Sequence, residues 1–222
     1  MIFSILCAIL TKTDDMGEGK MQLRNVVFDI GNVLADYRWY AFLQDKGFSP
    51  EMIDRIAGVS TQNPAWDEFD RGVLSSREVV ESFIRLDPEI AAELHRAFDD
   101  LSGLLHLFPY SIPWIQRLKS AGYHVYYLSN YSRKAIRDCP EVLEFLPFVD
   151  GGIFSCDVKV IKPDPAIYHK LLETFRLIPE ETVFLDDRQE NIDGACRAGM
   201  KGIRFRSYEQ AVQALAQLGI RC

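Results

Sequence analysis

The stretch RNVVFDIG (24–31) decides the fold of this 222-residue chain. A short run of β-branched and aromatic residues ends in an aspartate and a glycine, which predicts a buried strand over Arg24–Asp29 followed by a tight turn. The stretches TVFLDD (182–187) and HVYYLSN (124–130) have the same form, because each apolar run ends in a polar pair. The sequence therefore predicts three buried strands with polar residues at their ends.

Segments with helical periodicity separate these strands. We predict helices over Ile112–Ala121, Pro165–Phe175, Gln189–Ala198 and Ser207–Leu218, and a further strand over Gly202–Phe205. Strands that alternate with helices of about ten residues form βαβ units, and such units build a parallel sheet. The fold class is therefore α/β.

The segment from residue 37 to residue 105 departs from this alternation. Its apolar residues recur at helical spacing, with breaks at Ser49–Pro50, Gly72 and Asp87–Pro88. We therefore predict an all-helical insertion after the first strand.

Composition limits the function. Hydrophobic residues make up 48% of the chain and charged residues 26%, which is typical of a globular protein. With 25 Lys and Arg against 32 Asp and Glu, the net charge is −7, so non-specific binding to nucleic acid is not expected. The five cysteines are scattered without a C-x-x-C pair, which favours a reducing compartment over a disulfide or zinc framework. We expect a cytoplasmic protein.

The first twenty residues are set apart from the rest. Ile2–Leu10 is apolar, but about ten residues cannot span a bilayer that needs roughly twenty. The positive start and small-residue cleavage site of an export signal are missing, although such a signal remains the alternative. We expect residues 1–20 to form a disordered extension before a working start at Met21. No other segment is apolar and long enough for a membrane.

Polar side chains gather at the predicted strand ends. In open parallel sheets, ligands bind just beyond the carboxyl ends of the strands. The residues at such ends are Asp29, Ser129, Asn130, Asp186 and Asp187. In addition, Lys162 and Pro163 follow a segment, Gly152–Ile161, that we predict to be extended.

The charges of these residues indicate a metal. Asp29, Asp186 and Asp187 contribute −3 and Lys162 contributes +1, so an empty site would carry about −2. A divalent cation brings this sum to about zero. Mg²⁺ suits a site with carboxylates, a backbone carbonyl and waters, completed by a substrate phosphate. We therefore expect bound Mg²⁺ and an anionic substrate.

Four stretches carry a resemblance to a known family. FDIGNVL (28–34), LSN (128–130), KP (162–163) and FLDDRQENIDGA (184–195) resemble, in order, the four motifs of the haloacid dehalogenase-like (HAD) hydrolase superfamily. WDEFDRGVLSSREVVESF (66–83) resembles the helical cap that some members insert after the first motif. The D-x-G-N-V form is similar to a subgroup that includes sugar-phosphate phosphatases.

The resemblance, which covers residues 24–220, implies a domain organisation. A Rossmann-like catalytic core comprises residues 21–36 and 106–222, and a helical cap comprises residues 37–105. The reaction expected on this scaffold is phosphoryl transfer through an aspartyl-phosphate intermediate.

The resemblance also implies roles in this chemistry. Asp29 matches the nucleophile, since covalent catalysis by a carboxylate divides a difficult displacement into two easier steps. Ser129 matches a hydroxyl that binds the transferring phosphoryl group, and Asn130 adds an amide donor there. Lys162 matches the lysine that offsets charge on both phosphate and nucleophile.

The metal ligands follow from the same motifs. Asp29 and the backbone carbonyl of Gly31 are expected to bind Mg²⁺ together with Asp187. Asp186 is expected to act through a water, and Asn191 to support the site or begin a helix.

The sequence breaks the family pattern at Gly31, where most phosphatases carry a second aspartate that protonates the leaving group and then activates water. General acid–base catalysis contributes roughly 10²–10⁴-fold in rate. Asp36 could replace this group, although it could equally cap the following helix. The substrate could instead carry a good leaving group, such as the anomeric oxygen of a sugar 1-phosphate or an acyl phosphate. Alternatively, the chain could bind phosphate and turn over slowly.

The function expected from these observations is a Mg²⁺-dependent phosphatase for a small phosphorylated metabolite, acting as a monomer or small homo-oligomer. The alternatives are a regulatory module that binds a phosphometabolite and a haloacid dehalogenase. Dehalogenation needs no metal, so the paired aspartates argue against it. The cap residues that could reach the site are Arg38, Trp39, Tyr40, Trp66, Phe69 and Arg71. We expect the aromatic ones to pack in the core, whereas Arg38 could contact phosphate or lie at the surface.

Overall fold

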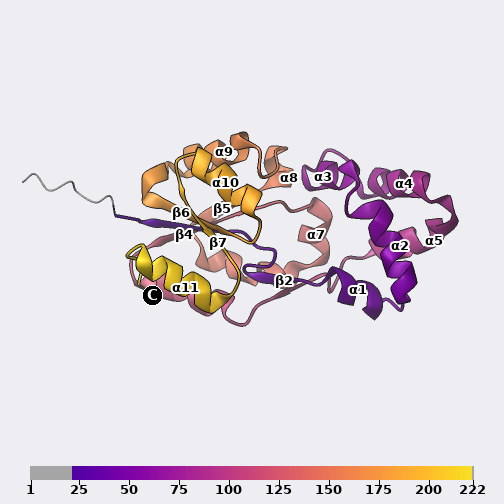
Figure 1. The fold of residues 1–222 in the computed structure, drawn as a ribbon, viewed down its shortest axis with the longest axis horizontal. Helices are drawn as coiled ribbons and strands as arrows, with labels where there is room; N and C mark the ends of the chain where they lie inside the picture. The colour runs from indigo at the N-terminus through magenta and orange to yellow at the C-terminus, as the bar shows by residue number, and fades with distance from the viewer. Residues whose placement is uncertain (1–21, 222) are drawn as a thin grey trace, which may run out of the picture.

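The computed structural model describes residues 22–221. The extension predicted over residues 1–20 and the proposed start at Met21 lie outside this part of the chain. The described residues form a parallel α/β core with a group of helices at one end (Figure 1). None of the described helices is long and apolar enough to cross a membrane.

The core is a five-stranded parallel sheet with the strand order β5-β4-β1-β6-β7. The strands are β1 (Asn25–Phe28), β4 (His124–Ser129), β5 (Gly151–Phe154), β6 (Thr182–Asp186) and β7 (Lys201–Arg204). In the central strand, Val27 pairs with Tyr126 of β4 and with Phe184 of β6. All four residues of β1 are buried, because both faces of a parallel sheet are covered. The predicted α/β class is confirmed.

Helices cover both faces of this sheet. Successive strand residues point to opposite faces, so Val27 packs with side chains of α9 and α10, whereas Phe28 packs with those of α6 and α11. These helices are α6 (Ser111–Ser120), α9 (Pro165–Phe175), α10 (Gln189–Arg197) and α11 (Tyr208–Gln217). The shorter helices of the core are α7 (Arg133–Asp138), η2 (Pro140–Phe148), α8 (Ser155–Val158) and η3 (Pro179–Glu181).

The helices between β2 and β3 form the cap, which lies to the right of the sheet in Figure 1. They are α1 (Trp39–Asp45), α2 (Pro50–Ser60), α3 (Pro64–Asp70), α4 (Ser76–Leu86), η1 (Pro88–Ile90) and α5 (Ala91–Asp99). Local sequence sets their ends: Ser49 caps α2, Asn63 caps α3, and Ser75 forms a capping box with Glu78 at α4. The division of the chain at residues 37 and 105 remains a prediction.

The helical pattern did not predict a two-stranded ribbon at the base of the cap. Strands β2 (Ala35–Tyr37) and β3 (Leu105–Leu107) pair antiparallel, with Tyr37 opposite Leu105. Each strand has three residues, which is too short for an alternating pattern to stand out.

The prediction of an extended segment over Gly152–Ile161 is wrong beyond Phe154. The strand β5 ends there, and one turn of helix, α8, follows directly. A four-residue helix has no apolar period that a sequence pattern can reveal.

Candidate active site

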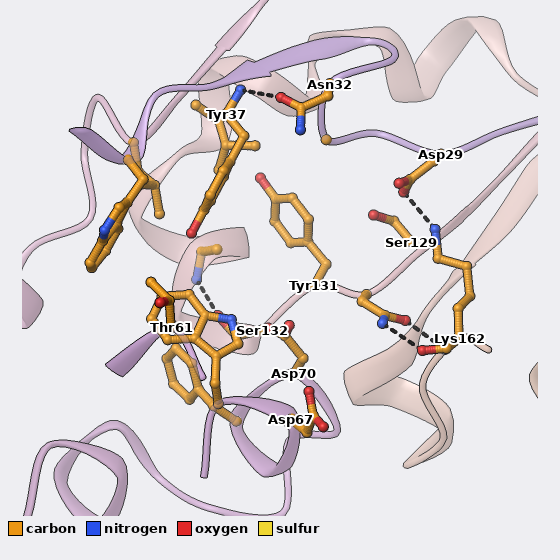
Figure 2. A pocket seen from close by; sticks show the side chains of 18 of the residues that line it. Asp29, Asn32, Tyr37, Thr61, Asp67, Asp70, Ser129, Tyr131, Ser132 and Lys162 are labelled. Carbon is orange, nitrogen blue, oxygen red and sulfur yellow. Dashed lines mark hydrogen bonds and ion pairs between the residues drawn. The ribbon is translucent and has the colours of Figure 1, made fainter. Parts of the chain in front are cut away.

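The predicted polar residues come together because three adjacent strands end at the same edge of the sheet. Asp29 follows β1, Ser129 ends β4 and Asp186 ends β6, and β1 lies between the other two. Lys162 reaches the same place from the loop between α8 and α9. Figure 2 shows Ser129 and Lys162 beside Asp29. The structure thus places these side chains close together at the carboxyl ends of the strands, whereas the chemical role of each residue remains a prediction.

Lys162 lies between two carboxylates. Its Nζ atom is 2.8 Å from Oδ1 of Asp29 and 2.6 Å from Oδ2 of Asp186, and all three residues are buried. Burial opposes the charge on Lys162, but Asp186 and Asp29 outweigh this effect and raise its pKa. Lys162 therefore carries its positive charge at neutral pH.

The surroundings of Asp29 raise the pKa of its carboxyl. Burial raises the pKa of Asp29 to about 7, against the opposing effect of Lys162, and the charge of Asp186 adds to the rise. A further cation in the site would favour the ionised form, which is the nucleophilic form.

Asp186 and Asp187 differ in how the protein holds them. Oδ1 of Asp186 accepts hydrogen bonds from the backbone N–H of Arg188 at 2.8 Å and from Nδ2 of Asn191 at 3.0 Å, while Lys162 contacts Oδ2. The carboxylate of Asp187 accepts one hydrogen bond among the described residues, from Nδ2 of Asn32 to Oδ2 at 3.0 Å. Asp187 therefore has an oxygen available for a metal, whereas the protein already occupies both oxygens of Asp186.

The donor set fits a divalent cation. One oxygen each from Asp29, Asp186 and Asp187 lies within 4.8 Å of the others. Carboxylate oxygens together with a nearby backbone carbonyl are the ligands that Mg²⁺ takes in proteins. The direct role of Asp187 and the water-mediated role of Asp186 remain predictions.

Asn130 holds the loop that carries Lys162. Its Nδ2 atom donates to the backbone carbonyl of Lys162 at 3.0 Å, and its Oδ1 atom accepts from the backbone N–H of Lys162 at 2.8 Å. This pair of bonds fixes the lysine relative to the end of β4. The predicted contact of Asn130 with substrate stays a prediction.

A cavity of about 430 Å³ lies between the core and the cap. Its core side includes Asp29, Gly31, Ser129, Asn130, Lys162 and Asp187, and its cap side includes Trp39, Trp66, Phe69 and Phe98. The cap aromatics also pack on one another, with the ring centres of Trp66 and Phe98 5.9 Å apart. The expected core packing therefore holds for Trp39, Trp66 and Phe69, which also form part of the pocket wall.

Other cap residues from the sequence analysis do not line this pocket. Arg38 is half-buried, pairs with Asp45 at 3.4 Å, donates to the carbonyl of Gly103 and is not among the residues that line the pocket. Tyr40 is exposed, and Arg71 pairs with Glu68 at 3.1 Å. Asp36 is exposed on β2, outside the pocket wall.

Two carboxylates of the pocket were missed by the sequence analysis, namely Asp67 and Asp70 of α3. Residues three apart share one face of a helix, so the spacing in DEFD (67–70) could have indicated a shared acidic face. Asp70 is half-buried, and desolvation in the pocket raises its pKa to about 7, with the charges of Asp67 and Asp29 adding to the rise.

A parallel sheet with an aspartate at its central strand end, a buried lysine beside it and a helical cap above it is the arrangement of the HAD hydrolases. The model of the haloacid dehalogenase-like hydrolase family matches residues 23–199, and the chain belongs to this family.

Similar proteins include phosphatases and a dehalogenase. A sesquiterpene phosphatase of Aspergillus oryzae is 24% identical over 195 residues, which is 86% of this chain and 94% of that protein. A phosphorylated carbohydrates phosphatase of Thermotoga maritima is 25% identical over 186 residues, covering 80% of this chain and 82% of the relative. An (S)-2-haloacid dehalogenase of Burkholderia cepacia is 28% identical over 112 residues, but the match spans 50% of this chain and 47% of that enzyme.

Solved structures share the fold. A HAD family enzyme of Bacteroides thetaiotaomicron, in complex with magnesium and inorganic phosphate, superposes with a TM-score of 0.61 at 18% identity. The superposition covers 84% of this chain and 96% of that enzyme.

Proposed function

We propose that the chain is a Mg²⁺-dependent phosphatase that hydrolyses a small phosphorylated metabolite through an aspartyl-phosphate on Asp29. One observation carries this proposal: the buried Asp29 carboxylate contacts Lys162 and shares a cluster with Asp186 and Asp187, and Asp29, Lys162 and Asp187 line the cavity between core and cap. Three carboxylates and one lysine provide an anionic nucleophile, a positive group for the phosphoryl oxygens and ligands for a cation.

The residues that would hold Mg²⁺ are Asp29, the backbone carbonyl of Gly31 and Asp187, with Asp186 acting through a water. When bound, Mg²⁺ neutralises charge on the phosphoryl oxygens and orients the phosphate. The hydrogen bonds that Asp186 accepts from Arg188 and Asn191 keep its carboxylate in a fixed orientation toward this place.

The chain's own residues position and stabilise the phosphoryl group. Lys162 stays charged and contacts Asp29, so its ammonium lies where a phosphoryl oxygen would approach the nucleophile. Ser129 supplies a hydroxyl donor on the same side, and Asn130 fixes the backbone of Lys162. Such preorganised donors are effective because they require no rearrangement as charge develops.

The size of the cavity and the names of the relatives support a small phosphate ester. About 430 Å³ accommodates a small molecule. The relatives from Aspergillus oryzae and Thermotoga maritima are named as phosphatases of a sesquiterpene and of phosphorylated carbohydrates. A sugar phosphate is therefore one substrate class to test, together with phosphates of larger apolar alcohols.

A haloacid dehalogenase is the alternative on the same scaffold. In that reaction Asp29 would attack a carbon atom without a metal. The close grouping of Asp186 and Asp187 with Asp29 favours the metal-dependent reaction. A regulatory module with weak turnover would use the same phosphate-binding residues.

Hydrolysis of p-nitrophenyl phosphate tests the proposal, with Mg²⁺ or EDTA and with chloride release from 2-chloropropionate measured in parallel. We expect Mg²⁺-dependent phosphate release, and Asp29→Asn should retain less than about a hundredth of it. Asp54→Asn removes an exposed carboxylate of α2 outside the pocket and serves as the matched control. Chloride release without metal would support the dehalogenase instead, and phosphate binding without turnover would support the regulatory module.

A further inference from the structure

Among the described residues, the core side of the pocket carries no carboxyl group besides Asp29 and Asp187, both of which are assigned other roles. Gly31 stands where the family pattern has an aspartate, and Asp36 is exposed on β2 away from the pocket. Apart from Asp29 and Asp187, the carboxylates that line the pocket within the described residues are Asp67 and Asp70. Both belong to the cap.

The geometry of phosphoryl transfer places the leaving group, and therefore its proton donor, on the cap side of the pocket. The attacking and leaving oxygens lie roughly in line in the transition state. If Asp29 attacks from the floor of the pocket, the leaving oxygen points away from Asp29 and toward the cap. Figure 2 shows Asp70 on the wall across the pocket from Asp29.

We propose that Asp70 is the general acid and general base of this enzyme, supplied by the cap in place of a group at position 31. This inference rests on the proposed phosphatase function. It assigns Asp70 a proton transfer to the leaving oxygen in the first step, and a proton transfer from water in the second.

The core holds Asp70 in place through its backbone. The carbonyl oxygen of Asp70 accepts a hydrogen bond from Oγ of Ser155 at 2.6 Å. The same Oγ atom accepts from the backbone N–H of Tyr131 at 2.9 Å, one residue after Asn130. The end of α3 is thereby tied to the loop that follows Ser129 and carries Asn130.

A glycine allows this close approach. Gly72 has a φ of +65°, and a Cβ atom there would lie 2.8 Å from Nζ of Lys159 and 3.0 Å from the carbonyl oxygen of Cys156. Lys159 donates a hydrogen bond to the carbonyl of Gly72. The turn after Asp70 therefore packs directly on α8, which fixes the backbone of Asp70 relative to the core.

The surroundings of Asp70 suit both proton transfers. The titratable groups that face it are Asp67 on its own helix, Asp29 and Lys162 on the core, and Tyr37. Desolvation in the pocket and the charges of Asp67 and Asp29 raise its pKa to about 7, against opposing effects of Trp66 and Lys162, and a general acid–base group works best with a pKa near the working pH. Asp67, by contrast, is exposed.

The two steps balance as follows. An oxygen of the Asp29 carboxylate forms a bond to phosphorus, the ester P–O bond breaks, and the leaving oxygen takes its electron pair and the proton of Asp70. Water then attacks the phosphorus, Asp70 accepts a proton from that water, and the bond between Asp29 and phosphorus breaks. Inorganic phosphate leaves, and Asp29 is again a carboxylate while Asp70 is again protonated.

The test measures kcat/KM with Mg²⁺ across phenyl phosphates whose leaving groups differ in pKa. Asp70→Asn should retain most of the activity on p-nitrophenyl phosphate in the first turnover, giving a burst of about one nitrophenolate per enzyme followed by slow turnover. On phenyl phosphate its kcat/KM should fall by about 10²–10⁴-fold.

A pH profile on phenyl phosphate is the second measurement. The kcat/KM of the parent should fall at alkaline pH, and that of Asp70→Asn should not. Glu68→Gln, a carboxylate of the same helix outside the pocket, is the control.

The possible results separate this inference from the proposed function. If Asp29→Asn is inactive but Asp70→Asn has the leaving-group dependence and pH profile of the parent, the role of Asp70 is overturned and the phosphatase stands. If Asp67→Asn or Asp36→Asn shows the steep dependence instead, that residue is the acid and the inference is wrong. If Asp29→Asn remains active, the covalent mechanism itself is wrong. Restoration of the parent profile by Asp70→Glu would support a carboxyl group acting at this position.

Discussion

Nζ of Lys162 lies 2.6 Å from Oδ2 of Asp186, and neither side chain reaches solvent. The same Nζ atom contacts Asp29, so one ammonium group pairs with two carboxylates on neighbouring strands. Lys162 therefore both compensates the negative charge of the site and stabilises the ends of the two strands that carry these carboxylates.

Replacing Lys162 with Met should therefore reduce both activity and stability. Removing one partner of a buried ion pair typically costs about 3–5 kcal/mol, because the remaining charge is left uncompensated. Urea unfolding in EDTA measures this loss. Lys119→Met, which breaks the partly exposed pair with Asp150, should cost no more than about 1 kcal/mol. A similar small loss for Lys162→Met would contradict the structural role of the lysine.

The two adjacent aspartates should respond differently to replacement. Asp187→Asn should weaken Mg²⁺ binding with little loss of stability in EDTA, since the Asp187 carboxylate accepts one hydrogen bond among the described residues. Asp186→Asn should destabilise the protein even without metal, because it removes the partner of Lys162. Titration calorimetry with Mg²⁺ and thermal unfolding in EDTA separate the two effects. Equal metal affinities in the two variants would show that their roles are assigned wrongly.

The stability of the Asp70→Asn variant should depend on pH. Asp70 has a raised pKa of about 7 against a reference value of 3.8, so the folded state binds its proton more tightly than the unfolded state does. The parent then loses stability as the pH rises from about 4 to 7. The variant lacks this loss, and its Tm should rise relative to the parent across that range and stay higher at pH 8. A Tm difference that does not change with pH would show that Asp70 is not perturbed.

An aspartate at position 31 should replace Asp70. A Cβ atom at Gly31 meets nothing within 4 Å, so Gly31→Asp is sterically tolerated. In the Asp70→Asn background, this change should recover kcat/KM on phenyl phosphate and reduce the dependence on the leaving group. Gly31→Asn in the same background adds similar bulk without an acid and should recover nothing. Equal recovery by both would mean that position 31 acts through shape alone.

Gly72→Ala should destabilise the protein by more than about 1 kcal/mol, because the left-handed backbone and the contact with Cys156 both disfavour a side chain. Gly58 is exposed within α2 and has nothing within 4 Å of an added Cβ atom. Gly58→Ala is therefore the matched control and should stabilise by about 0.5–1 kcal/mol. Thermal unfolding compares them, and a neutral Gly72→Ala would show that the turn does not need glycine.

The three central strands β4, β1 and β6 were predictable because they are buried on both faces. The predicted bounds His124–Ser129, Pro165–Phe175 and Thr182–Asp186 match the structure, since apolar runs and a proline at a helix start are strong local signals. The parallel order then brings Asp29 and Asp186 to one edge without further information.

The place of Asp70 could not be predicted in the same way. It depends on how α3 packs on the core, and the bond that fixes it joins Ser155 to a backbone carbonyl 85 residues earlier. Every residue type has a backbone carbonyl, so the sequence carries no signal for such a contact. The spacing of Asp67 and Asp70 indicates a shared face but does not say what that face meets.

The ribbon at the base of the cap has a consequence for how such an enzyme can change. Because Tyr37 and Leu105 are paired across it, the chain leaves the core and returns to it at neighbouring points. Residues 38–104, here called the cassette, could therefore be replaced by a different insertion without moving a strand of the parallel sheet. If the cassette carries the proton donor as well as the wall around the substrate, one exchange would alter selectivity and proton transfer together, while the nucleophile and the metal ligands stayed in place.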